Sequence, residues 1–315
     1  VKSLPTLNGT YGKEINYNLS KLLSTDSYKD NIIYASSDLE KYGLSILDKQ
    51  ITGTPKKAID DNSTVTITIS SVDCMKEVEA KVPINIAKGK SSIDEFVIIP
   101  NRTYNGKVID ITVPFVKDES GNEIKDAVVG LSYQIKTDNG QYESTTADNS
   151  GASNDGEAPK YAGEYKVTAS FTGNDNYAEA EAKTAVFTIK KVSLTVNPLP
   201  GQIIFPNETE TYKPKYEVTG AVNNEMLEFS GDLKLDDGKK IMDNNLTLND
   251  PFDKNYSMTV TENVTVSILD NVAANEKIIL SGTIEDGAYI DQVTVTASSG
   301  FLIKSEGGAL TKAEN

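Results

Sequence analysis

The sequence predicts an all-β protein, built as tandem β-sandwich domains in an elongated array. A Thr-Tyr phrase recurs about every hundred residues, beginning at Thr10, Thr103 and Thr211. Valine, isoleucine and threonine alternate with polar residues in many short runs, which is the period of a pleated strand with one buried face. A repeat of roughly a hundred residues indicates whole domains rather than small solenoid units. Apolar β-runs close the successive stretches at residues 82–86, 186–189 and 264–268.

The first domain is expected over residues 1–90. Its middle holds Gly43-Leu44-Ser45, then Ile51-Thr52-Gly53-Thr54-Pro55, then an alternating run at 64–69. Gly-Thr-Pro predicts a turn, because proline restricts the residue before it to extended geometry. These phrases resemble the Ig, cadherin-like modules of bacterial surface proteins, over residues 4–88. The resemblance implies an Ig-like β-sandwich, but the sequence has no Asp-x-Asn-Asp-Asn linker of the kind that binds calcium in true cadherins.

The second domain is expected over residues 91–192. Apolar runs at 95–99 and 109–113 predict two strands. The segment 145–159 is rich in glycine, serine, asparagine and aspartate and has no apolar anchor, so we expect a mobile, solvent-exposed loop there.

The stretch from Ala162 to Tyr177 is the most specific pattern in the chain. It alternates with period two and ends in Gly173-Asn174-Asp175-Asn176, which predicts a turn. Its Ala-Gly-x-Tyr-x-Val-x-Ala-x-Phe spacing resembles a bacterial Ig-like repeat, the kind arrayed in tandem in large surface proteins, over residues 93–191.

A third sandwich is expected over residues 193–270 and a partial or small fourth β module over 271–315. The third resembles the mostly bacterial Ig-like (MBG) group over 193–269, through its Pro-x-Tyr-x-Val-Thr-Gly opening and the Asn-Tyr pair before the last hairpin. The fourth resembles the start of another surface repeat. Short joints at 87–92 and 190–193 leave little slack between domains, which is why we expect the array to be elongated.

The residue inventory argues against an enzyme. The chain has no histidine, which removes Ser-His-Asp and Cys-His machinery and nearly every zinc site. It has no phosphate-binding loop and no dinucleotide-binding glycine motif. Paired carboxylates would still allow glycoside hydrolysis, but 46 acidic residues make their presence uninformative, and tryptophan platforms are absent. We therefore predict no catalytic, cofactor-binding or metal-binding residues and no cofactor.

Three local patterns leave an alternative open. Oxygen-bearing residues surround a glycine at 118–123 and would suit Ca²⁺, but a polar hairpin turn is the favoured interpretation. For Gly173 to Asn176 a left-handed turn is favoured over a ligand site. Lys13 and Asn85 lie near the start and end of the first domain, where some surface Ig-like domains form an isopeptide bond; the favoured alternative is a paired asparagine on an edge strand.

The tyrosines bear on glycan binding. Tyr104, Tyr165 and Tyr177 would stack on sugars if exposed, but we expect them in the cores or as corner clamps. A polar concave patch with two or more exposed tyrosines would favour glycan binding, and core-facing tyrosines would favour a spacer. The single cysteine, Cys74, permits no intrachain disulfide and is expected to be a half-buried structural thiol.

The charge restricts the partners. A net charge of −15 and a pI of about 4.6 disfavour nucleic acid and anionic membranes. No apolar run of 18 residues occurs, and a chain that begins at Val1 is expected to be trimmed, with targeting segments missing. We expect a monomeric, non-catalytic spacer or adhesion region of a bacterial secreted or cell-surface protein that contacts host or matrix protein or glycan. The alternative is a glycan-binding or accessory region of a surface carbohydrate-active enzyme.

Overall fold

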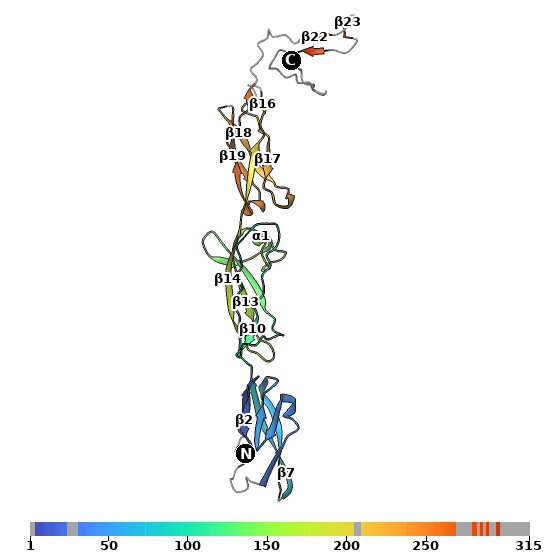
Figure 1. Ribbon diagram of the computed structural model, residues 1–315, viewed down its shortest axis with the longest axis vertical. Coiled ribbons are helices and arrows are strands. Elements are labelled where there is room, and N and C mark those ends of the chain that lie inside the picture. Colours follow the sequence, from blue (N-terminus) through green and yellow to red (C-terminus); the bar gives the residue numbers. More distant parts are fainter. Residues whose placement is uncertain are drawn as a thin grey trace. The chain divides into compact units, whose positions relative to one another are not determined.

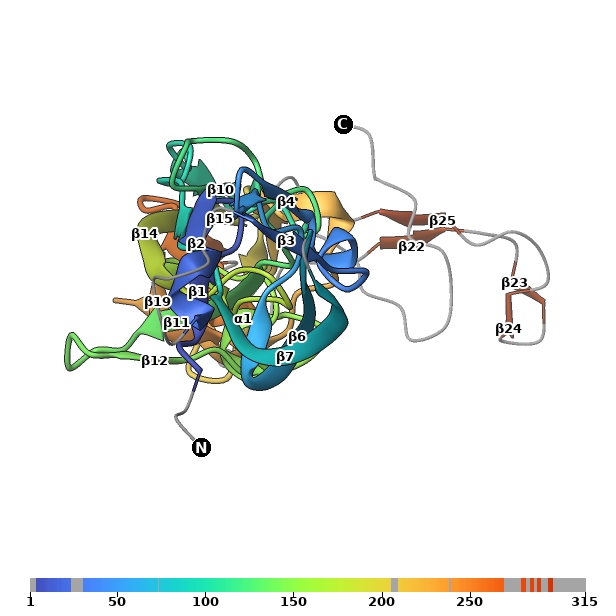
Figure 2. The same cartoon turned by 90° about the horizontal axis from the view of Figure 1, so that it is seen from below.

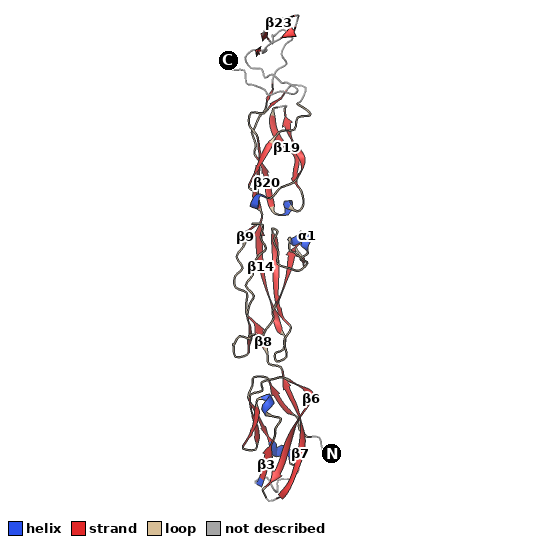
Figure 3. Ribbon diagram, turned by 90° about the vertical axis from the view of Figure 1, so that its right-hand side faces the viewer, coloured by secondary structure: helices blue, strands red, loops and turns tan. Residues whose placement is uncertain are grey.

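The computed structural model describes residues 4–23, 31–72, 74–204, 209–237 and 239–268, and four short strands between 279 and 296 (Figure 1). The chain divides into two compact units, Val1–Lys190 and Lys191–Asn315. Of the residues that the structure describes, 49% are in strands and 7% in helices, which confirms the predicted all-β class (Figure 3). Among the described residues, no helix is long and apolar enough to cross a membrane.

Unit 1 begins with the N-terminal sandwich, made of β1 to β7. One sheet has the order β1-β7-β6-β3 and the other β2-β5-β4. β1 runs parallel to β7, and the other ladders are antiparallel. Figure 2 shows the long, curved β6–β7 pair. The strands are β1 (Leu7–Thr10), β2 (Ile15–Asn18), β3 (Ile32–Ala35), β4 (Leu44–Leu47), β5 (Gln50–Gly53), β6 (Ile59–Ser71) and β7 (Cys74–Ala87).

The core of this sandwich follows the alternation in the sequence. Val65 and Ile67 on β6 are fully buried, as are Val82 and Ile84 on β7, so the runs at 64–69 and 82–86 are strands as predicted. The turn predicted for the Gly-Thr-Pro phrase does not form: Gly53 ends β5, and Thr54 and Pro55 follow without turn geometry. Glycine is still required at position 53. Its φ is 128°, and a Cβ there would lie 2.5 Å from the carbonyl oxygen of Gly43.

The central sandwich, β8 to β14, completes unit 1. Its main sheet has the order β12-β11-β13-β14-β9, with β9 parallel to β14, and β8 pairs with β10 in a second, two-stranded sheet. Phe171, Val116 and Ile93 lie in one core cluster between the sheets. The strands are β8 (Ser91–Ile93), β9 (Arg102–Thr103), β10 (Val116–Asp118), β11 (Gly130–Lys136), β12 (Tyr142–Ser144), β13 (Gly163–Phe171) and β14 (Ala180–Lys190).

The strands predicted at 95–99 and 109–113 do not form. The chain between β8 and β9 runs as a tan trace alongside β14, tied by the Lys183–Glu95 ion pair and by the Thr188 amide on the Asn101 side chain rather than by a backbone ladder (Figure 3). The apolar pattern does set the inward side chains of the second run, since Ile109 and Ile111 are buried. A strand also needs a backbone partner, which local periodicity does not supply.

The segment 145–159 is anchored, contrary to the prediction of an exposed loop. It holds a one-turn helix, α1 (Ala147–Ser150), with a capping box between Thr146 and Asn149. Thr145 and Ser150 are buried, and the Ser150 carbonyl accepts the amides of Lys160 and Tyr161. Short polar side chains hold this segment through caps and turns, although it has no large apolar anchor.

Unit 2 contains β15 to β25. A sheet of order β17-β15-β20 faces the β18–β19 hairpin, and β16 runs parallel to β21. Val196, Leu233 and Ile241 lie in its core cluster. The strands are β15 (Val192–Pro198), β16 (Ile203–Ile204), β17 (Tyr216–Thr219), β18 (Phe229–Asp236), β19 (Lys240–Leu248), β20 (Tyr256–Val260), β21 (Ser267–Ile268), β22 (Ile279–Ser281), β23 (Ile284–Glu285), β24 (Ala288–Tyr289) and β25 (Thr294–Thr296). Most of the predicted fourth module lies outside the described residues.

Candidate functional site

A hydrogen-bonded polar site in unit 1 is the joint, residues 87–92, which links β7 to β8. The Gly89 amide donates to the Asn176 carbonyl oxygen, and the Ala178 amide donates to the Gly89 carbonyl oxygen, both at 2.9 Å. Gly89 and Tyr177 therefore form a short parallel β-bridge. A Cβ on Gly89 would lie 3.2 Å from the Tyr177 ring, so glycine lets that ring rest against the joint.

The turn that receives the joint is built from the end of the Ala162–Tyr177 pattern. Gly173 has a φ of 85°, and a Cβ there would lie 2.7 Å from the carbonyl oxygen of Tyr177. The Asn174 side-chain oxygen accepts the amides of Asn176 at 3.0 Å and Tyr177 at 2.8 Å. This is the left-handed turn that the sequence predicted, because glycine supplies the positive φ and asparagine the local acceptor.

Three further hydrogen bonds hold the turn and the strand after it to neighbouring segments. The Ala58 amide donates to the Asn176 side-chain oxygen at 3.1 Å. The Lys88 ammonium donates to the Asn174 carbonyl oxygen, and the Ser91 hydroxyl donates to the Ala178 carbonyl oxygen at 2.8 Å. Both the joint and the loop before β6 are thus bonded to the central sandwich.

Tyr11 and Tyr177 meet beside the joint. Their ring centroids lie 5.1 Å apart with an interplanar angle of 79°, an edge-to-face contact. Tyr11 itself follows β1, and its amide donates to the Ala87 carbonyl oxygen at 2.9 Å. The Tyr11 ring of the N-terminal sandwich therefore lies next to the end of β7, where the joint begins.

The recurring Thr-Tyr phrase has the same structural position in its first two copies. Tyr104 repeats the bond of Tyr11, since its amide donates to the Lys190 carbonyl oxygen at 2.8 Å. Gly12 and Gly106, which follow these tyrosines, both have a φ of 73°. The third copy differs, because the Tyr212 hydroxyl donates to the side-chain oxygen of Gln202 at 2.8 Å. In two of its three copies, the phrase therefore lies at the end of a strand that runs parallel to the last strand of its sandwich: β1 beside β7, and β9 beside β14.

Charged groups surround the rings. The Glu119 carboxylate pairs with the ammonium groups of Lys13 and, at 3.3 Å, Lys90. Hydrogen bonding from Lys13, and then from Lys90, lowers the pKa of Glu119. All three side chains are well exposed, so each pair contributes little by itself and is screened by salt.

The segment 118–123 is the polar hairpin turn that the sequence favoured. The backbones of Lys117 and Glu123 form an isolated antiparallel β-bridge, and Gly121 has a φ of 83°. Asp118 accepts the amides of Ser120 and Asn122, each at 2.9 Å, and the bond from Asn122 is the main cause that lowers the pKa of Asp118. Within the part of the chain that the structure describes, no three acidic, cysteine or histidine side chains are grouped as a metal would need.

The other candidate residues lie apart from one another. Lys13 contacts Glu119, whereas Asn85 lies in the β1–β7 ladder opposite Asn8. Asn85 is thus paired in a strand as favoured, but β7 lies between β1 and β6 and is not the edge strand that the sequence predicted. The side chain of Cys74 is outside the described part of the structure.

The described tyrosines are buried or half-buried. None of those whose side chains the structure describes is exposed. The Tyr165 hydroxyl donates to the Tyr161 carbonyl oxygen at 3.0 Å, and its ring stacks on Phe187 at 5.6 Å. Tyr104 and Tyr165 are buried as predicted, whereas Tyr177 is half-buried at the joint. The buried set is Tyr17, Tyr34, Tyr104, Tyr133, Tyr165 and Tyr256.

Sequence comparison finds no matching family model and no matching curated protein. Among solved structures, the chain is similar to human protocadherin-24 EC1-2, at 13% identity over 53% of this chain and 84% of that one, with a TM-score of 0.24. It is also similar to Sidekick-1 immunoglobulin domains 1–5, at 12% identity, 85% and 60% coverage, and a TM-score of 0.22.

A third similar structure is a SusE-like, surface-located polysaccharide-binding protein from the Bacteroides thetaiotaomicron heparin utilisation locus. The identity is 14% and the TM-score 0.21, over 69% of this chain but only 38% of that one. At such identities the likeness concerns the fold alone. At TM-scores of 0.21 to 0.24 these similarities carry no argument about this chain.

Proposed function

We propose that this chain is a non-catalytic spacer and adhesion region of a bacterial secreted or cell-surface protein. The proposed domains are residues 1–90, 91–192 and 193–270, followed by a small fourth module at 271–315. The proposal includes the bacterial Ig-like resemblance of the repeats, an extracellular location, a monomeric state and a host or matrix protein or glycan as the contact. The bonded joint at Gly89 is the observation that carries it.

The joint supports a spacer because a spacer has to transmit the position of one domain to the next. A free linker of this length would leave the two sandwiches of unit 1 to reorient independently. Here the linker backbone forms a β-bridge with Tyr177, and two aromatic rings pack beside it. Each additional contact narrows the range of orientations that the joint allows.

The strand topology supports a load-bearing role. β1 is parallel to β7, β9 to β14 and β15 to β20, so the strand near the start of each sandwich is bonded to a strand near its end. A pull on the two ends of such a pair loads the hydrogen bonds in shear. These bonds then resist together rather than opening one at a time.

The tyrosines favour the spacer over the glycan-binding alternative. That alternative calls for a concave patch with two or more exposed tyrosines, and no tyrosine whose side chain the structure describes is exposed. Even the half-buried Tyr142 is covered, because the Lys166 ammonium lies 4.8 Å from the centre of its ring.

The test is the spread of distances across the joint in the full chain. With Cys74 replaced by serine, spin labels are placed at Val78 and Val128, which are 55% and 82% exposed on the N-terminal and central sandwiches. Electron–electron double resonance should give a narrow distribution, and a Gly-Ser-Gly-Ser insertion after Gly89 should broaden it. Equally broad distributions with and without the insertion would contradict the spacer proposal.

A further inference from the structure

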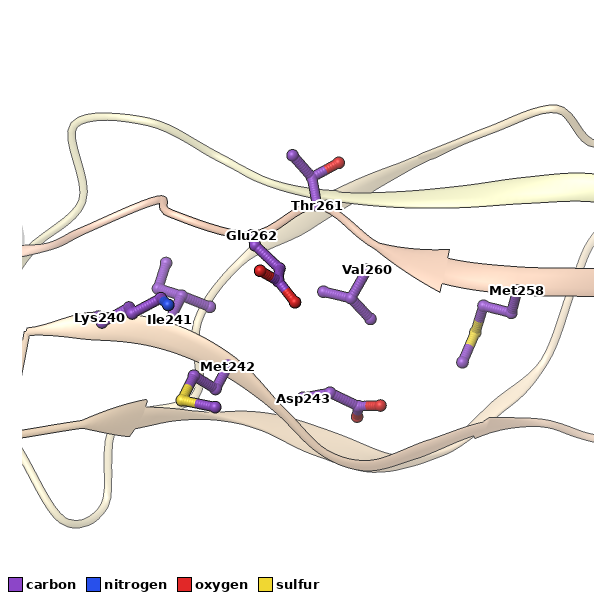
Figure 4. A pocket seen from close by; sticks show the side chains of 8 residues that line it. All are labelled: Lys240, Ile241, Met242, Asp243, Met258, Val260, Thr261 and Glu262. Atoms are coloured by element: carbon purple, nitrogen blue, oxygen red, sulfur yellow. The ribbon is translucent and has the colours of Figure 1, made fainter.

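Two edge strands of unit 2 line an open groove (Figure 4). β19 is one edge of the β18–β19 hairpin, and β20 is an edge of the β17-β15-β20 sheet. The groove has a volume of about 270 Å³, and Met242, Met258 and Val260 form its apolar lining. Figure 4 shows Met242 on one side, from β19, and Met258 and Val260 on the other, from β20.

At the closed end of the groove, β19 is bonded to the segment that follows β20. There Lys240 and Thr265 form an isolated antiparallel β-bridge, and the Ile241 amide donates to the Val264 carbonyl oxygen at 2.8 Å. Next to this bridge Asn263 has a φ of 70°, which interrupts the extended backbone. The groove opens beyond this point, and the Asp243 and Glu262 carboxylates both line it.

The carboxylates of Asp243 and Glu262 differ in their hydrogen-bond partners. Asp243 accepts the Leu246 amide at 2.8 Å through one oxygen, which leaves the other oxygen available. The Glu262 carboxylate forms no hydrogen bond or ion pair with any residue that the structure describes, and Figure 4 shows it directed into the groove. Lys240 also lines the groove, so the three charged groups sum to one net negative charge.

We propose that this groove binds an extended basic peptide, with one arginine or lysine side chain laid along the methionines and its cationic head between Asp243 and Glu262. A cation at that place would neutralise the two carboxylates that line the groove. The groove lies in unit 2 and its binding does not depend on the joint, so either proposal can fail alone.

The lining of the groove suits both the apolar stem and the cationic head of such a side chain. Methionine thioethers adapt their shape to a ligand, and the methylene stem of lysine or arginine packs readily on apolar surface. A guanidinium forms short, charge-assisted hydrogen bonds with carboxylates. The groove is smaller than the roughly 300–1,000 Å³ of small-molecule sites, which suits one long side chain rather than a cofactor.

The backbone provides the second half of the recognition. An edge strand has a row of amide and carbonyl groups directed away from its sheet, and an extended peptide can pair with them. β20 is bonded to β15 on one side only. The peptide is therefore expected to add alongside β20, with its basic side chain turned into the groove.

The experiment is a titration of the full chain, labelled at the methionine methyl groups, followed by NMR. The chain has four methionines, and Met226, which is 90% exposed and outside the groove, serves as the internal control. The probe is the blocked peptide Thr-Val-Arg-Val-Thr, compared with its Lys, Gln and Glu versions at the central position. The Met242 and Met258 signals should shift with the Arg and Lys peptides, while Met226 stays in place.

Variants then test the charges. Glu262→Gln should weaken binding at least fivefold, and the double variant with Asp243→Asn should weaken it further; asparagine keeps the acceptor for the Leu246 amide. Glu217→Gln, an exposed carboxylate outside the groove, should have no effect. Equal binding of the Gln peptide, unchanged affinity of the double variant, no shift up to millimolar peptide, or the same shifts with calcium chloride and none with peptide would each overturn the proposal.

Discussion

The replacement Tyr177→Ala is the most direct probe of the joint. It removes the ring that meets Tyr11 edge-to-face at 5.1 Å and that rests on Gly89. It leaves in place the two backbone bonds of Gly89, to the Asn176 carbonyl oxygen and from the Ala178 amide. The variant therefore tests whether side-chain packing stabilises this β-bridge.

The size of the effect follows from the two contacts that are lost. An edge-to-face aromatic pair contributes about 1 kcal/mol beyond its buried area. The half-buried ring adds roughly 1 kcal/mol, about half of the value for full burial of a large side chain. Opening of the joint should thus become about 2 kcal/mol easier, and at 1.4 kcal/mol per factor of ten this makes amide exchange roughly 30-fold faster.

The assay is native-state hydrogen exchange of the Gly89 and Ala178 amides in the full chain. Tyr177→Phe keeps the ring and is the matched control, with exchange expected close to that of the unchanged protein. The amides of β13 report on the stability of the central sandwich itself. If Gly89 exchanges within twofold of the unchanged protein in Tyr177→Ala, or if β13 is accelerated as much as Gly89, the reasoning about the joint is wrong.

Three further predictions concern the rest of the chain. Gly53→Ala should destabilise the N-terminal sandwich by roughly 2 kcal/mol or more in denaturant unfolding, because the new Cβ meets a backbone oxygen at a φ of 128°; Gly121→Ala, at a φ of 83° in open space, should cost clearly less. Because the pKa of Glu119 is lowered in the folded state, its contribution is present above the unfolded pKa and is lost as pH falls through the folded value; a carboxyl titration followed by NMR should give a pKa below the ordinary one, rising toward it in Lys13→Gln or in high salt. Removing divalent ions with a chelator should leave the melting temperature within about 2 °C, and a drop of roughly 10 °C or more would reveal a tight ion site.

Local patterns in the sequence were sufficient wherever a strand has one buried face and its partner is close along the chain. Val65 and Ile67 on β6, and Tyr165 and Val167 on β13, face inward as the alternation predicts. These ladders join neighbours in sequence, β6 to β7 and β13 to β14. The left-handed turn at Gly173 could also be predicted from the sequence, since it depends on glycine and on an asparagine acceptor one residue away.

Strand pairing between segments that are distant in the sequence could not be predicted from local patterns. The runs at 95–99 and 109–113 have the composition of strands, but no backbone ladder continues there from β8 and β10. The segment 145–159 has the composition of an exposed loop, but helix caps and backbone hydrogen bonds anchor it without large apolar side chains.

The sequence by itself determined the all-β class, the inward side chains of the long strands and the absence of histidine-based chemistry. It also contained the turn at Gly173 and the acidic hairpin after Asp118, but as unrelated features. Only the tertiary structure brought these two to Tyr11, Lys13 and Gly89, and only the tertiary structure placed Asp243 and Glu262 in the lining of one groove. Such contacts depend on how separate segments are placed in three dimensions, which the period of a single strand does not specify.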